Sequence, residues 1–169
     1  MSRSLGAELP PDLLVRLSHA DLPHHLATVL PLITVDAGGF PHPMLLSSLE
    51  VRAVAPETIR TVIGARSRSA RNLLERPAAT LLIIEPDRTV YVKARATDGP
   101  YSVTGLPDVG LFVLTVEDVL EDAPQEWEGA MRITGAATYA PAPSLDEPWA
   151  RATLDALSRG PGDERARSA

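Results

Sequence analysis

The chain has 169 residues, of which 44% are hydrophobic and 22% charged, with 16 lysines and arginines, 22 aspartates and glutamates, and no cysteine. This composition is typical of a soluble globular domain that is long enough to bury a core of its own. The lack of cysteine excludes disulfides, thiolate metal sites and iron–sulfur clusters. The formal net charge of −6 lacks the basic excess of a general nucleic-acid-binding protein, so any site for an anion has to be local.

No apolar run approaches the roughly 20 residues of a membrane-spanning helix, and the N-terminal residues lack the apolar centre of a signal peptide. We therefore expect a cytoplasmic protein that binds neither a membrane nor nucleic acid. The four histidines have no carboxylate at a spacing typical of metal ligands, so the sequence predicts no metal site.

Residues 1–29 are predicted to form short helices. Leucines recur there at helical spacing, as at Leu13 and Leu17, and Asp12 and Ser18 are candidate caps. We expect these helices to pack over an opening of a barrel, because a strand pattern begins directly after them.

The first predicted strands form a hairpin. The aliphatic and β-branched residues 30–35 run into Asp-Ala-Gly-Gly at 36–39, where glycine permits the positive φ of a tight turn. An alternating pattern predicts the returning strand over 44–53, and a third strand is expected over 58–63.

After the third strand, Gly64 interrupts the pattern, and apolar residues within 70–74 predict a short helix that Pro77 ends. Further strands are expected at 79–84, 89–96, 111–119 and 131–139. The sequence therefore predicts a mainly β fold, an antiparallel barrel of six or seven strands with a few short helices.

We expect a single domain over residues 1–158. It comprises the helical segment 1–29, the barrel over 30–140 and a C-terminal helix at 148–158. Residues 159–169 are expected to be a flexible tail, because they are rich in glycine and charge and have no large apolar side chain to bury in a core.

Four arginines lie between positions 66 and 76 against one acid, Glu75, which makes a local charge of +3 in a chain of net charge −6. If Ser67 caps the helix, its hydroxyl, the hydroxyl of Ser69 and the free backbone N–H groups meet at the positive end of the helix dipole. Arg68 can add charged hydrogen bonds, so a phosphate would fit. Gly64 would let a planar ring lie along the neighbouring strand edge, a geometry that suits flavin mononucleotide (FMN).

The alternative is that these arginines form a solvated helix face that pairs with Glu75 and other acids. From the residue types alone this is the better explanation, because most arginine clusters are solvated. The order of motifs along the chain favours the phosphate site instead.

Four short motifs carry that argument. They are Leu-Ile-Thr-Val-Asp at 32–36, Gly-Phe-Pro at 39–41, Ser-Arg-Ser-Ala-Arg-Asn-Leu at 67–73 and Pro-Ala-Ala-Thr-Leu at 77–81. In order and spacing they resemble the pyridoxamine-phosphate-oxidase-like, FMN-binding split barrels. The resemblance implies a split barrel with FMN as cofactor, and a homodimer with cofactor sites at the subunit interface.

The resemblance also implies roles for particular residues. The loop Ser67-Arg68-Ser69 would bind the FMN phosphate, the strand from Met44 to Leu49 would line the isoalloxazine ring, and the partner subunit would contribute Arg88 and Thr89. The candidate cofactor-binding residues are Met44, Leu45, Leu46, Ser47, Ser48, Ile63, Gly64, Ser67, Arg68, Ser69, Arg71, Asn72, Arg88 and Thr89.

The sequence departs from true pyridoxamine-phosphate oxidases where those carry charge. Met44, Leu49 and Ser69 stand where basic residues are expected, and residues 159–169 contain no histidine for the Arg-x-His arrangement that grips the substrate phosphate. We therefore expect an FMN-dependent oxidoreductase of another small molecule, with no catalytic side chain assigned. The alternatives are a flavin carrier or sensor without turnover, and a split barrel that uses the deazaflavin F420 or haem.

Overall fold

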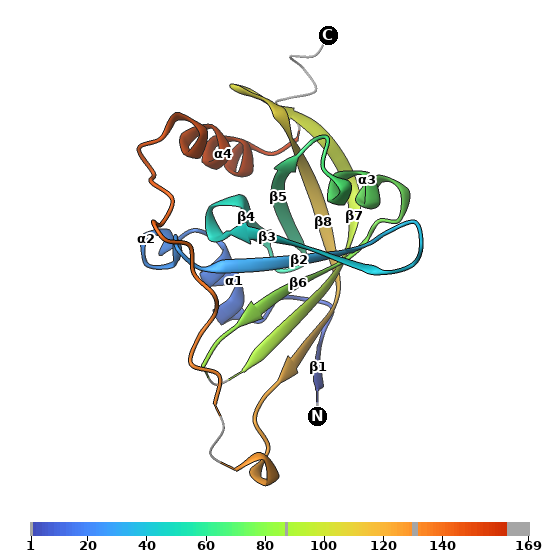
Figure 1. Ribbon diagram of the computed structural model, residues 1–169, viewed down its shortest axis with the longest axis vertical. Helices are drawn as coiled ribbons and strands as arrows, with labels where there is room; N and C mark the ends of the chain where they lie inside the picture. The colour runs from blue at the N-terminus through green and yellow to red at the C-terminus, as the bar shows by residue number, and fades with distance from the viewer. Residues whose placement is uncertain (1, 87, 130–131, 162–169) are drawn as a thin grey trace.

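Figure 1 shows the computed structural model, which describes residues 2–86, 88–129 and 132–161. The strands in these ranges are β1 (Arg3–Gly6), β2 (Val29–Val35), β3 (Pro41–Ser47), β4 (Val51–Ala55), β5 (Thr58–Gly64), β6 (Ala78–Ile84), β7 (Thr89–Val103) and β8 (Leu106–Asp122). The helices are α1 (Pro11–Leu17), α2 (Leu22–His25), α3 (Arg68–Glu75) and α4 (Pro148–Arg159), with short 3-10 helices η1 (Ser48–Glu50) and η2 (Glu126–Glu128).

The strands form one antiparallel sheet in the order β3-β2-β6-β7-β8-β5-β4, and β1 pairs with β8. The two outer strands of this order, β3 and β4, follow one another in the chain and are joined by η1 alone. The sheet therefore bends round on itself into a barrel with a split between β3 and β4 (Figure 1).

Alternate residues of the strands fill the barrel interior. Leu32 on β2, Leu81 on β6 and Phe112 on β8 are each 1% exposed. Leu13 and Leu17 of α1 belong to the same apolar cluster, so α1 closes one opening of the barrel. Burial of this cluster is the main source of stability of the fold.

The predicted fold class is confirmed, because the chain forms a mainly antiparallel β barrel with a few short helices. Eight strands are found in the described ranges, where six or seven were expected. One addition is β1, which lies in the segment predicted to be helical. It lies on the surface, where Arg3 bonds to Glu121 at 2.7 Å and Ser4 to Asp118 at 2.7 Å.

The continuous strand predicted over 44–53 is wrong, because β3 ends at Ser47 and β4 begins at Val51. Glu50 makes the corner between them. Its Oε2 accepts hydrogen bonds from the backbone N–H of Ser47 at 2.7 Å and from the Ser47 hydroxyl at 2.9 Å. The Ser-x-x-Glu spacing of a capping box is visible in the sequence, but it lies inside an alternating pattern that favoured a strand.

The strand predicted over 131–139 is also wrong. Met131 lies outside the described residues, and over 132–139 the structure describes one isolated bridge, between Thr138 and Thr28. Six of the residues 132–139 are exposed, so this segment has no face to bury against the barrel. The Tyr139 hydroxyl nevertheless donates to the Leu45 carbonyl at 3.0 Å, beside β3.

Of the candidate caps, Asp12 does not cap a helix, whereas Ser18 is the C-cap residue of α1, and its hydroxyl donates to the Val15 carbonyl at 2.7 Å. Pro10 precedes α1, where a side-chain cap is missing, and Ser18 follows the last residue of that helix. Asp21 precedes α2. The carboxylate of Asp12 lies in the first turn of α1 and bonds to Arg88 instead.

Helix α4 occupies the predicted C-terminal helix and extends it by one residue, to Arg159. It packs outside the barrel, where Ala156 and Leu157 join a cluster with Val62 and Leu111. Of the predicted flexible tail, residues 162–169 lie outside the described ranges.

The corner at Glu50 generates a prediction about pH. Burial raises the pKa of Glu50 above its ordinary value of 4.5, although the hydrogen bonds from Ser47 act in the opposite direction. Because the folded state then binds the proton more tightly than the unfolded state, stability due to this group is lost as the pH rises from 4.5 through the folded-state pKa.

We therefore expect Glu50→Gln, whose amide oxygen can still accept from Ser47, to gain stability relative to the wild type between acidic and neutral pH. Urea unfolding of both proteins across this range measures the difference in unfolding free energy. A difference that stays constant, or that falls as the pH rises, would contradict this account of Glu50.

Candidate functional site

The loop between β5 and α3 is built by short backbone hydrogen bonds. The Ala65 N–H donates to the Asp108 carbonyl at 2.8 Å, which ties the loop to β8. The Ser67 N–H donates to the Gly64 carbonyl at 2.9 Å. Ser67 then caps α3, its hydroxyl oxygen accepting from the Ala70 N–H at 3.1 Å. The cap expected at Ser67 is therefore present.

The first turn of α3 offers backbone donors to an anion. The N–H groups of Arg68 and Ser69 precede the first intrahelical hydrogen bond, and no acceptor for them is found in the described part of the chain. They lie at the positive end of the helix dipole. The side chain of Ser69 is on the core side, since the residue is 2% exposed, so its backbone is better placed than its hydroxyl.

Three exposed arginines surround this turn, namely Arg66, Arg68 and Arg71. Among residues 2–86, 88–129 and 132–161, none brings a carboxylate into an ion pair with them. The fourth arginine of the stretch, Arg76, pairs with Glu75 at 2.7 Å. The alternative of a solvated helix face that pairs with acids therefore explains Arg76. It does not explain the other three arginines, whose positive charges gather at the start of α3.

A cleft of about 360 Å³ separates α3 from the turn between β2 and β3. Arg68 and Arg71 line it on the helix side, and Asp36 and Gly38 on the turn side. Asp36 is the one acid on the turn side, and its Oδ1 accepts from the N–H groups of Gly38 at 2.8 Å and Phe40 at 2.9 Å. Its charge is thus used within the hairpin turn.

Asn72 holds α3 against this hairpin. The residue is 2% exposed, and its Nδ2 donates to the Thr34 hydroxyl oxygen at 2.9 Å. The Thr34 hydroxyl in turn donates to the His42 carbonyl at 3.2 Å. Asn72 therefore positions the helix, and a direct contact with a cofactor stays a prediction.

Gly64 and Ile63 end β5 beside the loop. Ile63 is buried at 2% exposure, whereas Gly64 is exposed. Gly64 does not adopt a positive φ, and a Cβ placed there would approach the Ser67 Cβ no closer than 3.8 Å. Neither backbone conformation nor lack of space therefore requires a glycine at position 64. The surface beside Ser67 is open.

The residues expected to line a flavin ring, on β3 and at the start of η1, divide between the core and the surface. Leu46, Ser47 and Ser48 are buried, at 1%, 2% and 8% exposure. Met44 is half-buried, and Leu45 is 59% exposed. Leu45 is therefore the β3 candidate that most clearly faces outward.

The outer edge of β3 has few backbone donors. Because Tyr139 bonds to the Leu45 carbonyl, the odd-numbered residues of β3 direct their backbone groups away from β2. Pro41 and Pro43 have no N–H, and the N–H of Ser47 is used in the corner. The Leu45 N–H is thus the remaining donor on this edge among the described β3 residues.

Arg88 and Thr89 lie at the far end of the β6–β7 pair from α3. Thr89 pairs with Ile84 at the end of β6, whereas α3 leads into Ala78 at its beginning. A strand of this length spans roughly 20 Å. The two residues therefore cannot reach the start of α3 in the same chain, and their contribution from a partner subunit stays a prediction.

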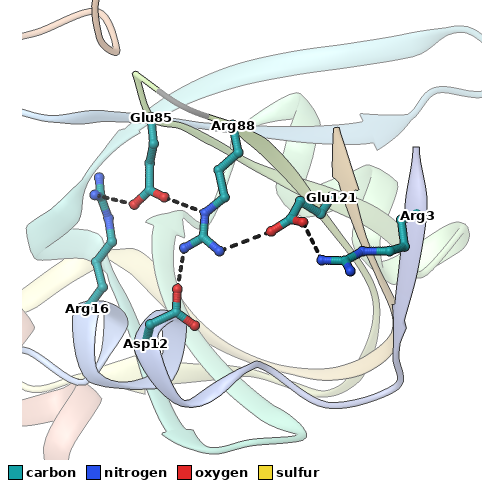
Figure 2. Close-up of polar contacts among 6 residues, drawn as sticks. All are labelled: Arg3, Asp12, Arg16, Glu85, Arg88 and Glu121. Atoms are coloured by element: carbon teal, nitrogen blue, oxygen red, sulfur yellow. Dashed lines mark hydrogen bonds and ion pairs between the residues drawn. The ribbon is translucent and has the colours of Figure 1, made fainter. Parts of the chain in front are cut away.

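Three carboxylates hold the guanidinium of Arg88 (Figure 2). Its Nε donates to Glu85 at 2.7 Å, its Nη1 donates to Glu121 at 3.1 Å, and its Nη2 donates to Asp12. Arg16 also pairs with Glu85, at 2.8 Å. The network therefore joins α1, the β6–β7 turn and β8.

This network sets the ionisation of its members. The hydrogen bond from Arg88 holds the pKa of Asp12 below its ordinary value, and Arg3 followed by Arg88 lowers the pKa of Glu121. The hydrogen bonds to Glu85 and then Asp12 raise the pKa of Arg88. The guanidinium of Arg88 therefore serves to hold parts of the fold together.

We expect Arg88→Met to destabilise the protein by about 2 kcal/mol, the size of one or two charged hydrogen bonds. The lowered pKa of Asp12 contributes stability above its ordinary value of 3.8, which is lost as the pH falls. The deficit of the variant should therefore shrink in acid. Lys93→Met is a matched control, because Lys93 forms a looser and more exposed pair with Asp118, at 3.8 Å. Equal unfolding free energies for the two variants would contradict this structural role.

Two features are missing from the described ranges. No helix in them is long and apolar enough to cross a membrane. No group of three or more histidine, aspartate and glutamate side chains in them could hold a metal ion.

The sequence matches no protein-family model and no curated protein. Solved structures do resemble the fold. A putative pyridoxamine 5'-phosphate oxidase from Lactobacillus delbrueckii superposes with a TM-score of 0.54 at 20% identity, over 69% of this chain and 98% of that chain. HupZ from Group A Streptococcus superposes with a TM-score of 0.50 at 13% identity, over 78% of this chain and 99% of that chain. At these sequence identities the comparison supports a similar fold and nothing beyond it.

Proposed function

We propose that this chain, which has the split-barrel fold of the pyridoxamine 5'-phosphate oxidase-like proteins, binds FMN with the phosphate at the start of α3 and acts as an FMN-dependent oxidoreductase on a small molecule. One observation carries the proposal. Arg66, Arg68 and Arg71 surround the capped N-terminus of α3 and have no carboxylate partner in the described ranges. A phosphate monoester supplies the negative charge that this place lacks.

The local charges favour such an anion. The N–H groups of Arg68 and Ser69 and the guanidinium of Arg68 can each donate to it, and a hydrogen bond to a charged group contributes about 1.5 to 3 kcal/mol. Two acids line the neighbouring cleft, but the Asp36 carboxylate is held by its own turn and Glu75 pairs with Arg76. The balance at the start of α3 is therefore positive.

We also propose a homodimer with a cofactor site at each end of its interface. Phe40 and Leu45 are 69% and 59% exposed on the hairpin and on β3, the strand at the split. A second copy would cover this apolar surface and exclude water from the ring. Because Arg88 is committed to three carboxylates, Thr89 is the better candidate of the pair for a contact with the partner's cofactor.

When bound, FMN supplies the hydride or electron transfer. The residues of this chain would bind its phosphate at α3, present the Leu45 N–H along the outer edge of β3, and exclude water through the dimer. These tasks need no side-chain acid or base, and no catalytic residue is assigned.

A carrier or sensor of flavin without turnover is the second candidate. The observation that favours it is the lack of basic residues at Met44, Leu49 and Ser69, of which Leu49 is fully buried. The absorption spectrum of the purified protein separates FMN from F420 and from haem. Oxidation of NAD(P)H by the flavin-loaded protein then separates an oxidoreductase from a carrier.

Arg68→Gln removes one charge and keeps the Ser67 cap. We expect FMN affinity to fall roughly 10- to 150-fold, the equivalent of about 1.5 to 3 kcal/mol. Arg95→Gln is the control, because Arg95 is exposed on β7 and pairs with Glu117 at 2.6 Å. Quenching of FMN fluorescence measures both affinities. If both variants bind FMN as the wild type does, the phosphate lies elsewhere.

Leu45→Lys tests the dimer. Val15→Lys is a matched control, since Val15 is 58% exposed on α1 and Leu45 is 59% exposed on β3. We expect the wild type and the Val15 variant to be dimers by light scattering, and the Leu45 variant to be a monomer with weaker FMN binding. A monomeric wild type, or a Leu45 variant that stays dimeric, would rule out this interface.

A further inference from the structure

A larger cleft lies away from α3, between α2, α4 and β4. Its volume is about 840 Å³. Figure 1 shows α2 and α4 on one side of the molecule, with β4 near them and α3 on the other side. The cleft is lined by Ser18 and His19 after α1, Leu22 of α2, Arg52 of β4 and Leu154 of α4.

Arg52 is the unexplained residue of this cleft. Its guanidinium forms no ion pair or hydrogen bond with any described residue, and its Nε is buried without a partner. Arg52 lies opposite Arg60 in the β4–β5 pair, so two like charges share one face of the sheet. Uncompensated charge in a partly buried position is costly, and nothing in the fold requires it here.

Arg60 shows the contrast. Its Nη1 donates to the carbonyl groups of Leu157 at 2.9 Å and Ser158 at 3.0 Å. These carbonyls belong to the last turn of α4, which carries the negative end of the helix dipole. The Nε of Arg60, like that of Arg52, is buried without a partner. The Nη1 of Arg60 nevertheless fastens α4 to the barrel, whereas no nitrogen of the Arg52 guanidinium has a partner among the described residues.

His19 lies beside Arg52 and supplies no negative charge. It is the one described non-glycine residue with a positive φ, at 70°. Its Nε2 is 3.0 Å from the Ser48 carbonyl and 2.7 Å from the Val51 carbonyl, so Nε2 carries the proton and donates. The Nδ1 is left buried without a partner. Burial, with a smaller effect from the charge of Arg52, lowers the pKa of His19 and so favours the neutral ring.

Asp155 and Arg151 also line the cleft, and each is paired with a residue of opposite charge. Asp155 of α4 pairs with Arg159 at 2.9 Å, and Asp146 pairs with Arg151 at 3.5 Å. The positive charge of Arg52 is therefore the unbalanced charge of the cleft.

The remaining walls are apolar. Leu22 is buried at 5% exposure, and Leu145 and Leu154 pack on the same small cluster beneath α4. A cationic group and an apolar wall thus face the same space, whose volume suits a molecule of metabolite size.

We propose that the cleft between α2, α4 and β4 binds a small organic anion, with a carboxylate or phosphate head on Arg52 and an apolar body against Leu22, Leu145 and Leu154. This site is separate from the one at the start of α3 and does not depend on FMN. An anion would compensate Arg52 as the α4 carbonyls compensate Arg60.

Titration calorimetry of the full-length protein with octanoate, octyl phosphate and octanol tests this. We expect at least one of the two anions to bind ten times more tightly than octanol, and the better of them identifies the head group. Acetate and inorganic phosphate, which have the head without the body, should bind at least tenfold more weakly than the corresponding octyl ligand. Octanol binding as tightly as both anions, or no binding of either anion, would overturn the proposal.

Two variants locate the site. Arg52→Gln should weaken binding of the octyl anion at least tenfold and leave FMN affinity unchanged. Arg68→Gln should leave binding of the octyl anion unchanged, whether or not it weakens FMN binding. Failure of the FMN proposal is therefore distinguishable from failure of this one. An Arg52 variant that binds the anion as the wild type does would contradict the site.

Thermal unfolding separates this role from a structural one. Without ligand, Arg52→Gln should melt at the same temperature as the wild type or higher, because it removes a like charge opposite Arg60. A lower melting temperature would assign Arg52 to the fold instead. Asp163 and Glu164 lie outside the described ranges, so the full chain carrying Asp163→Asn and Glu164→Gln is a second control. A melting temperature lowered by these two substitutions would show that the tail compensates Arg52 and would overturn the proposal.

Discussion

The closure of the barrel depends on one partly buried hydrogen-bond acceptor, the side chain of Glu50. Glu50 accepts the N–H and the hydroxyl of Ser47, and in doing so turns the chain from β3 into β4. These strands are the first and last of the sheet order, so the corner brings the two ends of the sheet together. The same corner ends β3 at Ser47 and leaves its outer edge, with Leu45 exposed, at the split of the barrel. The surface proposed to face a flavin and a second copy exists because the corner is there.

The arginines of this protein divide by whether the fold compensates them. Arg88 is bound by three carboxylates, and Arg60 by the last carbonyls of α4. The three at the start of α3, and Arg52 in the cleft beneath α4, have no such partner among the described residues. The uncompensated charge of the partly buried Arg52 costs stability, whereas the three exposed arginines concentrate positive charge at one end of a helix. We propose a ligand of opposite charge at each place. Both proposed sites follow from this contrast.

Much of the fold could be predicted from local patterns. The β2–β3 hairpin, the Ser67 cap and the helix that ends before Pro77 form as expected, because turn glycines, capping hydroxyls and prolines act over a few residues. The corner at Glu50 could not be separated from a strand, since Glu50 also alternates in phase with the polar residues Ser48 and Arg52. The strand expected over 131–139 does not form, because its existence depended on a partner strand that periodicity does not reveal.

The sequence by itself determined the class of fold and the basic stretch at 66–76, because hydrophobic alternation and residue charge are properties of the chain alone. Only the tertiary structure decided which arginines are compensated. Arg76 forms an ion pair with its sequence neighbour Glu75, but Arg88 forms ion pairs with Asp12 and Glu121 from distant parts of the chain. Arg52 lies opposite another cation, Arg60. Compensation of a charge depends on distance in space, and distance in space is set by how the strands pair.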